Sequence, residues 1–155
     1  MMTTKEAESF VTEVDTRYLE SLMGYNARRA ALAIIGSFLE HMAVYDLRPV
    51  DFSVLSLITH NPGITSRQLC SALSILPPNL VGMINALEKR ELIARRPHPH
   101  DRRATGLHLT EVGQKLMRDA EQTASELEAQ ATSRLSATER KTLMRLLQKI
   151  YIKAK

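Results

Sequence analysis

The sequence is poor in the features that would point to secretion or membrane insertion. Its 155 residues contain one cysteine, which excludes an intramolecular disulfide and is typical of proteins from a reducing compartment. No uncharged apolar run reaches about 18 residues, the length that a membrane-spanning helix needs. The N-terminal segment MMTTKEAESF also lacks the apolar stretch of a signal peptide. We therefore expect a cytoplasmic protein without a membrane partner.

The common motifs of catalytic and metal sites are also missing. The chain has no glycine-rich phosphate loop, no HExxH, no G-x-S-x-G and no paired-cysteine metal motif. His98 and His100 lie close together, but without further ligands nearby they favour phosphate contact or plain solvation over metal binding. We expect no enzymatic activity, no cofactor and no metal site.

The chain does have apolar content and a localised positive charge. Hydrophobic residues make up 44% of it, enough for a folded core, and its length suits a single domain over residues 1–155. Residues 61–110 hold seven basic and three acidic residues and so carry the whole net charge of +4. A concentrated basic segment indicates a polyanionic partner, although a solvated face without function would have the same composition.

Helical periodicity dominates both ends of the chain. Apolar residues recur at steps of three and four from about Asp15 to Tyr45 and predict one long helix. A second apolar stripe on another face of this helix consists of Leu32, Ile35 and Leu39. A helix apolar on two faces is buried on two sides, one of them against a partner chain. Residues 114–155 contain neither glycine nor proline and predict two more helices, the second opened by a capping box at Ser136–Glu139.

The middle of the chain has the order of a helix-turn-helix. Val54 to Ile58 mark a short helix, and the capping box Thr65–Gln68 opens a second one. Pro77 and Pro78 suit the first turn of a third helix, which continues to about Arg90. The polar outward residues of this third helix are Asn79, Gly82, Asn85, Lys89 and Arg90. Asparagine can pair with adenine in the major groove, and Gly82 would let the backbone approach DNA closely.

A β-hairpin follows the third helix. Ile93 to Arg96 and Thr105 to Leu109 predict two strands, joined by a basic loop that contains Pro97 and Pro99. The prolines restrict this loop and lower the entropy lost on binding. Thr110 is a suitable N-cap for the next helix. A two-stranded ribbon after a helix-turn-helix is a wing.

In this order of elements the chain resembles the MarR family of winged helix-turn-helix regulators, over roughly residues 15–153. The segment LEKRELIARR, residues 87–96, matches the run that joins the recognition helix to the wing. The most specific match is the wing, where the family pattern of an acid, a basic tip and L-T-x-x-G is met by Asp101, Arg103, Ala104, Leu109, Thr110 and Gly113. Two departures are Glu91, where the family usually has glycine, and Gly82, where it often has a basic residue.

The resemblance implies a mainly α fold with a small β-hairpin wing, that is, a winged helix-turn-helix with a helical dimerisation bundle. Residues 15–48 and 111–153 would supply the dimerisation helices, and residues 50–110 the DNA-binding lobe. The family implies a homodimeric regulator, most often a repressor, that binds a pseudo-palindromic operator in double-stranded DNA and is released by a small-molecule effector. Arg103 looks like the tip that enters the minor groove, and Asp101 like the acid that shapes it. The residues expected to contact DNA are Thr65, Ser66, Arg67, Pro78, Asn79, Gly82, Asn85, Lys89, Arg90, Arg96, His98, His100, Arg102 and Arg103.

The segment GYNARRA, residues 24–30, resembles MarR members that sense phenolic acids or their coenzyme A thioesters. Arg28 and Arg29 lie in an otherwise apolar helix, and a buried guanidinium needs an anionic partner. That partner could be a ligand, Glu20 or the other subunit. The residues expected to bind the ligand are Tyr25, Arg28, Arg29, Phe38, His41, Met42 and Phe52.

Three alternatives stay open. The winged helix could bind a protein and never touch DNA. Cys70 could be a redox sensor, although its place between Leu69 and Leu73 favours a buried structural thiol. His41 could equally be a satisfied interior histidine.

Overall fold

The computed structural model describes residues 11–153, so the segment MMTTKEAESF, which carries the expectation of no signal peptide, lies outside the described residues. The chain divides into two compact units, Met1–Leu32 and Ala33–Lys155. Within residues 11–153 no single helix has the length and apolar character to cross a bilayer, although two bent pairs of consecutive helices reach both when taken together.

The N-terminal helical segment is broken where the periodicity predicts one continuous helix. Its elements are α1 (Arg17–Glu20), α2 (Met23–Met42) and the 3-10 turn η1 (Ala43–Tyr45). At the break, the side-chain amide of Asn26 donates to the backbone carbonyls of Glu20 at 2.7 Å and Leu22 at 2.8 Å. Asparagine competes for backbone groups in this way and favours helix ends over interiors. The prediction of an unbroken helix is therefore wrong at this point.

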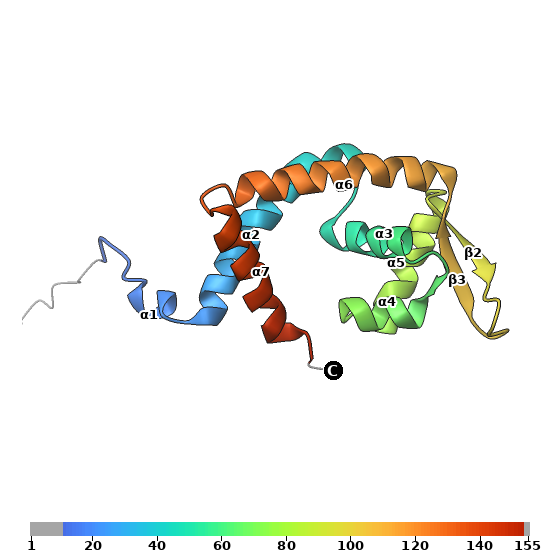
Figure 1. Cartoon of the computed structure of the whole chain (residues 1–155), viewed down its shortest axis with the longest axis horizontal. Coiled ribbons are helices and arrows are strands. Elements are labelled where there is room, and N and C mark those ends of the chain that lie inside the picture. The colour runs from blue at the N-terminus through green and yellow to red at the C-terminus, as the bar shows by residue number, and fades with distance from the viewer. Residues whose placement is uncertain (1–10, 154–155) are drawn as a thin grey trace, which may run out of the picture. The chain divides into compact units, whose positions relative to one another are not determined.

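The second unit contains the winged helix-turn-helix that the sequence predicts (Figure 1). Its elements are α3 (Pro49–His60), β1 (Ile64–Thr65), α4 (Ser66–Leu73), α5 (Pro77–Lys89), β2 (Ile93–Pro97) and β3 (Thr105–Leu109). We call β2, β3 and the loop between them the wing. The strands form an antiparallel sheet in the order β1-β3-β2. The predicted hairpin is confirmed, and the short β1 adds a third strand to it.

Cap and turn residues explain where these helices begin and end. The Thr65 hydroxyl accepts from the backbone N–H of Gln68, and the Gln68 side chain accepts from that of Thr65, so the predicted capping box is confirmed. Pro49 and Pro77 occupy the first turns of α3 and α5, where a missing N–H costs little. Ser74 ends α4 in a left-handed conformation, with φ 53°.

Two helices follow the wing, α6 (Glu111–Ala131) and α7 (Ala137–Tyr151). Thr110 caps α6, because its hydroxyl accepts from the backbone N–H of Gly113 at 3.0 Å. Ser136 and Glu139 form the predicted capping box of α7. The backbone N–H of Ser136 donates to the Glu139 carboxylate at 2.8 Å and lowers the pKa of that carboxyl.

One hydrophobic core fills the second unit, and α6 packs along α3 above it (Figure 1). Its largest fully buried side chains are Met42, Val54, Leu55, Ile58, Leu69, Leu80, Ile84, Leu87, Leu107 and Met117. Helix α7, in contrast, buries none of its side chains. Its exposed apolar residues include Leu143, Met144, Leu146, Leu147 and Ile150.

Candidate nucleic-acid interface and ligand cavity

Helix α5 buries one face in the core and presents the other to solvent. The buried face consists of Leu80, Ile84 and Leu87. The exposed face contains Pro78, Asn79, Gly82, Asn85 and Lys89. A Cβ added at Gly82 would meet no atom within 4 Å, so the fold itself does not require glycine there. This polar face is open to a partner.

Arg90, which helical spacing places on the same face, is instead engaged within the chain. Its guanidinium donates to the backbone carbonyls of Asp46 at 2.8 Å and Tyr45 at 3.1 Å. It also lies 3.9 Å from the Asp46 carboxylate. These contacts tie the end of α5 to the end of η1. Two of its five N–H groups are therefore used by the fold, and the expected contact with DNA stays a prediction for the remaining ones.

The turn from α5 into β2 explains why a glycine suits position 91. Glu91 is in the left-handed region, with φ 58°. Its N–H donates to the carbonyl of Glu88, and the N–H of Leu92 donates to that of Leu87. This pair of hydrogen bonds is a Schellman motif, whose left-handed residue is most often glycine. The chain therefore forms the expected turn although Glu91 stands where the family usually has glycine, and a residue with a side chain adopts the left-handed conformation.

Thr110 and Gly113, the T and G of the L-T-x-x-G motif, hold this junction against α6. The Thr110 hydroxyl donates to the carbonyl of Glu91 at 2.6 Å, and its N–H donates to that of Leu92 at 3.1 Å. A Cβ on Gly113 would lie 2.1 Å from the carbonyl oxygen of Leu92, closer than van der Waals contact allows. The motif therefore attaches the start of α6 to the base of the wing.

Three side chains connect the wing to the exposed face of α5. Arg95 on β2 donates from Nη2 to Oδ1 of Asn85 at 2.6 Å and from Nε to Oε2 of Glu88 at 3.0 Å. Asn85 and Glu88 are three residues apart on α5 and so lie on the same side of it. Arg95 is absent from the set predicted to contact DNA. The sequence signal that could have indicated this contact is the negative charge of Glu88, which lies on the helix before β2 and can pair with Arg95.

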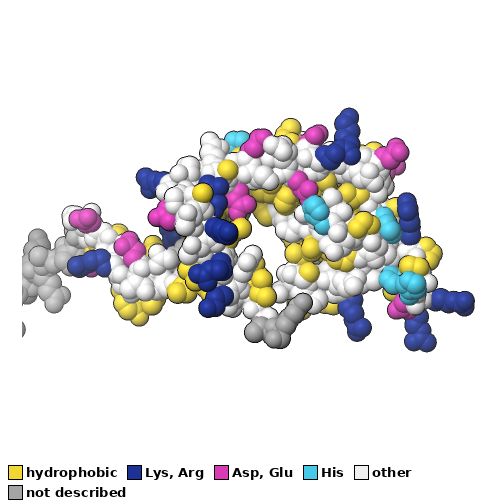
Figure 2. All heavy atoms as spheres, viewed as in Figure 1, with side chains coloured by type: hydrophobic (Ala, Val, Ile, Leu, Met, Phe, Trp, Pro, Cys, Tyr) yellow, Lys and Arg dark blue, Asp and Glu magenta, His cyan; other side chains and the backbone are white. Residues whose placement is uncertain are grey.

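The wing tip is a turn held by Asp101. The Asp101 carboxylate accepts from the N–H of Arg103 at 2.9 Å, and its carbonyl accepts from the N–H of Ala104 at 3.1 Å. This is the local bonding by which aspartate shapes turns. Arg102 and Arg103 are exposed, and no ion pair within residues 11–153 involves either of them. Figure 2 shows basic side chains projecting from the wing, at the right of the view, and in the sequence of the wing these are all arginines.

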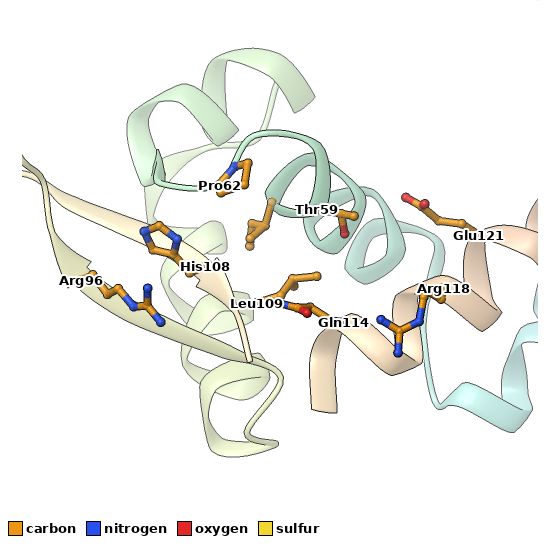
Figure 3. A pocket seen from close by; sticks show the side chains of 9 residues that line it. Thr59, Pro62, Arg96, His108, Leu109, Gln114, Arg118 and Glu121 are labelled. Atoms are coloured by element: carbon orange, nitrogen blue, oxygen red, sulfur yellow. The ribbon is translucent and has the colours of Figure 1, made fainter. Parts of the chain in front are cut away.

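Arg96 lies on strand β2, one pair before the loop, rather than at the tip of the wing. It pairs with Gly106 across the hairpin and lines a cavity of about 360 Å³ between the wing, α3 and α6. Figure 3 shows Arg96 and His108 on the strands at one end of this cavity and Arg118 of α6 at the other. A DNA contact by Arg96 would therefore come from a different part of the wing than one by Arg102 or Arg103.

The other residues expected to contact DNA lie at the start of α4 and in the wing loop. Ser66 and Arg67 are exposed in the first turn of α4, whereas the Thr65 hydroxyl is used in the cap. His98 Nδ1 accepts from the N–H of His100 at 3.3 Å. Over residues 11–153 no group of three or more His, Cys, Asp and Glu side chains is arranged to hold a metal ion.

A cavity of about 250 Å³ lies beside the first turns of α3. Its lining residues are Ile34, Ile35, Phe38, Pro49, Phe52, Ser53, Ala124, Leu127 and Glu128. The rings of Phe38 and Phe52 pack edge to face, with centroids 5.3 Å apart and an interplanar angle of 69°. Among these lining residues, Glu128 is the one that carries a charge. The cavity thus offers an aromatic, apolar surface beside a single carboxylate.

Of the residues expected to bind a ligand, Phe38 and Phe52 line this cavity. Met42 is 0% exposed and belongs to the core, so the expectation that it touches a ligand is corrected. His41 is exposed, and its Nδ1 lies 3.0 Å from the carbonyl of Ser37 one turn earlier. His41 therefore neither lines the cavity nor is an interior histidine.

Tyr25, Arg28 and Arg29 belong to the first unit. Both arginines are exposed and Tyr25 is half-buried, so the expected burial of a guanidinium is not seen in the single chain. Glu20, one of the partners considered for these arginines, instead accepts a hydrogen bond from the Thr16 hydroxyl at 2.6 Å. No ion pair of residues 11–153 includes Arg28 or Arg29. Within residues 11–153 their guanidinium groups are therefore open to solvent.

Cys70 lies on α4, half-buried and packed against the core. This placement favours the structural role that its apolar neighbours in the sequence suggest. The chain holds no second cysteine with which it could form an internal disulfide.

Comparison with known proteins places these features among transcriptional regulators. The model described as the MarR family matches residues 47–105, which span α3 to the start of β3. A putative transcriptional regulatory protein for the hcr operon of Thauera aromatica is 30% identical over 148 residues, covering 95% of this chain and 89% of that protein.

Two solved structures are similar over nearly the whole chain. The transcriptional repressor CouR bound to a 23-mer DNA duplex is 36% identical, with a TM-score of 0.83, covering 90% of this chain and 99% of that one. CouR bound to p-coumaroyl-CoA is 34% identical, with a TM-score of 0.80, covering 92% of this chain and 100% of that one.

Proposed function

This chain belongs to the MarR family of transcriptional regulators, and we propose that it is a homodimeric repressor that an aromatic coenzyme A thioester releases from its operator. The observation that carries the proposal is the open polar face of α5 beside a wing with two exposed arginines at its tip. The similarity to a repressor bound to a DNA duplex supports it.

In this proposal α5 enters the major groove, where Asn79, Asn85 and Lys89 face the base edges. Gly82 leaves room for the helix backbone to approach the DNA. Arg102 and Arg103 enter the minor groove, where positive side chains are favoured. The residues left to contact phosphates are Ser66, Arg67, Arg96, His98 and His100.

The homodimer is proposed from the apolar residues that the chain leaves exposed. On α7 these include Leu143, Leu147 and Ile150, which recur at helical spacing. The first unit adds Tyr18, Leu19 and Met23. Together with α6, these helices would form the dimerisation bundle. A two-fold dimer would place its two α5 helices about 34–36 Å apart, so that both reach the major groove on one side of the DNA.

The effector is proposed from the chemistry of the cavity lined by Phe38 and Phe52. Its aromatic wall suits a phenyl ring, and the Glu128 carboxylate can accept a hydrogen bond from a ring hydroxyl. With the hydroxyl at Glu128, the carboxylate of a free phenolic acid lies at the opposite end of the molecule, and it would lose its hydration against the apolar wall without a cation to pair with, which is unfavourable. A thioester has an uncharged acyl group and carries its negative phosphates at a distance. This difference favours the thioester, with Arg28 and Arg29 as candidates to pair with its phosphates.

The test is a footprint on DNA upstream of the protein's own gene, repeated with p-coumaroyl-CoA, p-coumarate and coenzyme A. We expect a protected palindrome that only the thioester exposes at micromolar concentration. If the footprint forms but none of the three compounds alters it, the proposed DNA binding is supported and the proposed effector is contradicted. No protection at any salt concentration would contradict DNA binding itself and favour a protein-interaction module.

A further inference from the structure

The contact between Arg95 and Asn85 bears on which base the proposed readout helix can recognise. Asn85 is exposed on the polar face of α5, and its side chain is already engaged by the wing. Arg95 reaches it from β2 at 2.6 Å and at the same time donates to Glu88 at 3.0 Å. The side chains of Arg95 and Glu88 are 40% and 42% exposed. The pair is therefore partly covered by the fold and lies at the edge of the proposed DNA-binding surface.

The chemistry of the guanidinium determines which end of the Asn85 amide it contacts. A guanidinium has five N–H donors and no acceptor. The Asn85 atom that faces Arg95 must therefore be the carbonyl oxygen Oδ1, whatever the ambiguity of amide orientation in general. The amide nitrogen, with its two N–H donors, is the end left for another partner. Glu88 fixes Arg95 in turn, because it accepts from Nε and holds the fork of the guanidinium toward Asn85.

We propose that Arg95 is a specificity-determining, positioning residue that makes Asn85 a hydrogen-bond donor toward DNA. An asparagine that reads adenine uses both amide ends, accepting from N6 and donating to N7. The Asn85 oxygen keeps a second lone pair, but Arg95 sets its direction, so we expect the amide nitrogen to face the DNA and to match an edge made of acceptors. Guanine offers two, N7 and O6, whereas adenine would present an N6 donor against the Asn85 donors. Each half-site should therefore contain a guanine at the position that Asn85 reads.

This inference rests on the proposed role of α5 as the readout helix and narrows it at one base. It also changes the expectation that the sequence alone supports, in which Asn85 pairs with adenine. The preference would be built into the free protein, since the Asn85 rotamer is held before DNA arrives.

The experiment is a binding-site selection from a randomised operator library, with wild type and three variants at matched salt. Asn85→Ala identifies the base position that Asn85 reads, as the one position at which the preference disappears. Arg95→Met removes the guanidinium but keeps an apolar stem of similar length. Arg102→Met is the matched control, since it makes the same replacement on the wing away from α5.

For wild type we expect guanine over adenine at that position by on the order of tenfold. Arg95→Met should reduce the ratio to about one or shift it toward adenine, with other positions unchanged. Arg102→Met should lower affinity at every sequence and leave the ratio as in wild type. Should Arg95→Met fail to fold, Glu88→Ala serves instead, because it releases Nε of Arg95 and should weaken the same preference.

The proposal is overturned if wild type selects adenine at the Asn85 position, or if Arg95→Met lowers affinity without changing the preference. In the second case Arg95 supplies only charge. Failure of wild type to select any sequence would contradict the proposed function itself, an outcome distinct from the other two.

Discussion

Glu91 occupies a backbone conformation that its side chain disfavours. At φ 58° an L residue costs about 1 kcal/mol or more relative to glycine. We expect Glu91→Gly to raise the free energy of unfolding by roughly 0.5–1 kcal/mol, after allowance for the more flexible unfolded chain. Urea denaturation at fixed protein concentration measures this. Lys115→Gly on the exposed side of α6 is the control and should lower stability by about 1 kcal/mol. Destabilisation by both changes would contradict the left-handed turn.

Gly113 and Gly82 are two helical glycines with opposite surroundings. A Cβ at position 113 would collide with the Leu92 carbonyl, whereas one at position 82 meets nothing within 4 Å. Gly113→Ala should therefore cost about 1–3 kcal/mol of stability, and Gly82→Ala should add about 0.5–1 kcal/mol. Thermal melting of the two variants side by side tests both signs. A Gly113→Ala variant as stable as wild type would show that α6 does not approach the wing base as closely as described.

The sequence patterns could not predict which of the individual arginines are free to contact a partner. The count of basic residues between positions 61 and 110 indicated a polyanion partner, but it could not say which guanidinium is free. Arg90 is held by the carbonyl of Asp46, a residue 44 positions earlier, and Arg95 by a helix that precedes it. A long flexible side chain pairs with whatever the tertiary fold brings within reach, and periodicity within one element does not contain that information.

At the scale of elements, local signals were sufficient wherever a cap or a turn residue was present. The capping boxes at Thr65 and Ser136 and the prolines Pro77 and Pro78 marked helix starts that the structure has. The break between α1 and α2 was missed because the apolar spacing runs through it, while the Asn26 side chain ends the helix by bonding to the backbone. Strand β1 was missed because two residues cannot show an alternation.

The wing is the element on which the proposed DNA contact can be tested most directly. Arg103→Ala should weaken operator binding by about 1–3 kcal/mol and flatten the salt dependence by about one unit of slope, without loss of folding. Asp101→Ala should also weaken binding, because the turn that holds Arg103 is lost, yet it removes a negative charge and should leave the salt slope nearly unchanged. Fluorescence anisotropy across a salt series separates the two. Equal binding by Arg103→Ala and wild type would refute the tip assignment.

For the whole molecule, the proposed homodimer should be a condition of operator binding. Leu147→Glu places a charge on the apolar stripe of α7 and should shift the protein to a monomer, because burying an unpaired carboxylate at an interface is costly. Gln148→Glu adds the same charge to the neighbouring position and is the control. Sedimentation velocity at micromolar concentration reports the assembly, and a gel shift reports operator binding. A Leu147→Glu dimer that binds DNA like wild type would place the interface elsewhere.

The effector proposal can be tested through the charge of one cavity residue. If the aromatic acyl group occupies the cavity of Phe38 and Phe52, wild type should release its operator at lower concentrations of p-coumaroyl-CoA than of p-coumarate, by on the order of tenfold. Glu128→Gln replaces the charged acceptor of the ring hydroxyl by a neutral one. It should therefore weaken both ligands by a similar factor, and Phe52→Ala should also weaken both. Arg28→Ala and Arg29→Ala should weaken the thioester alone, since only the thioester carries phosphates. Calorimetry and operator release measure these four variants. Unchanged affinity for both ligands in Glu128→Gln and in Phe52→Ala would mean that the acyl group lies outside this cavity.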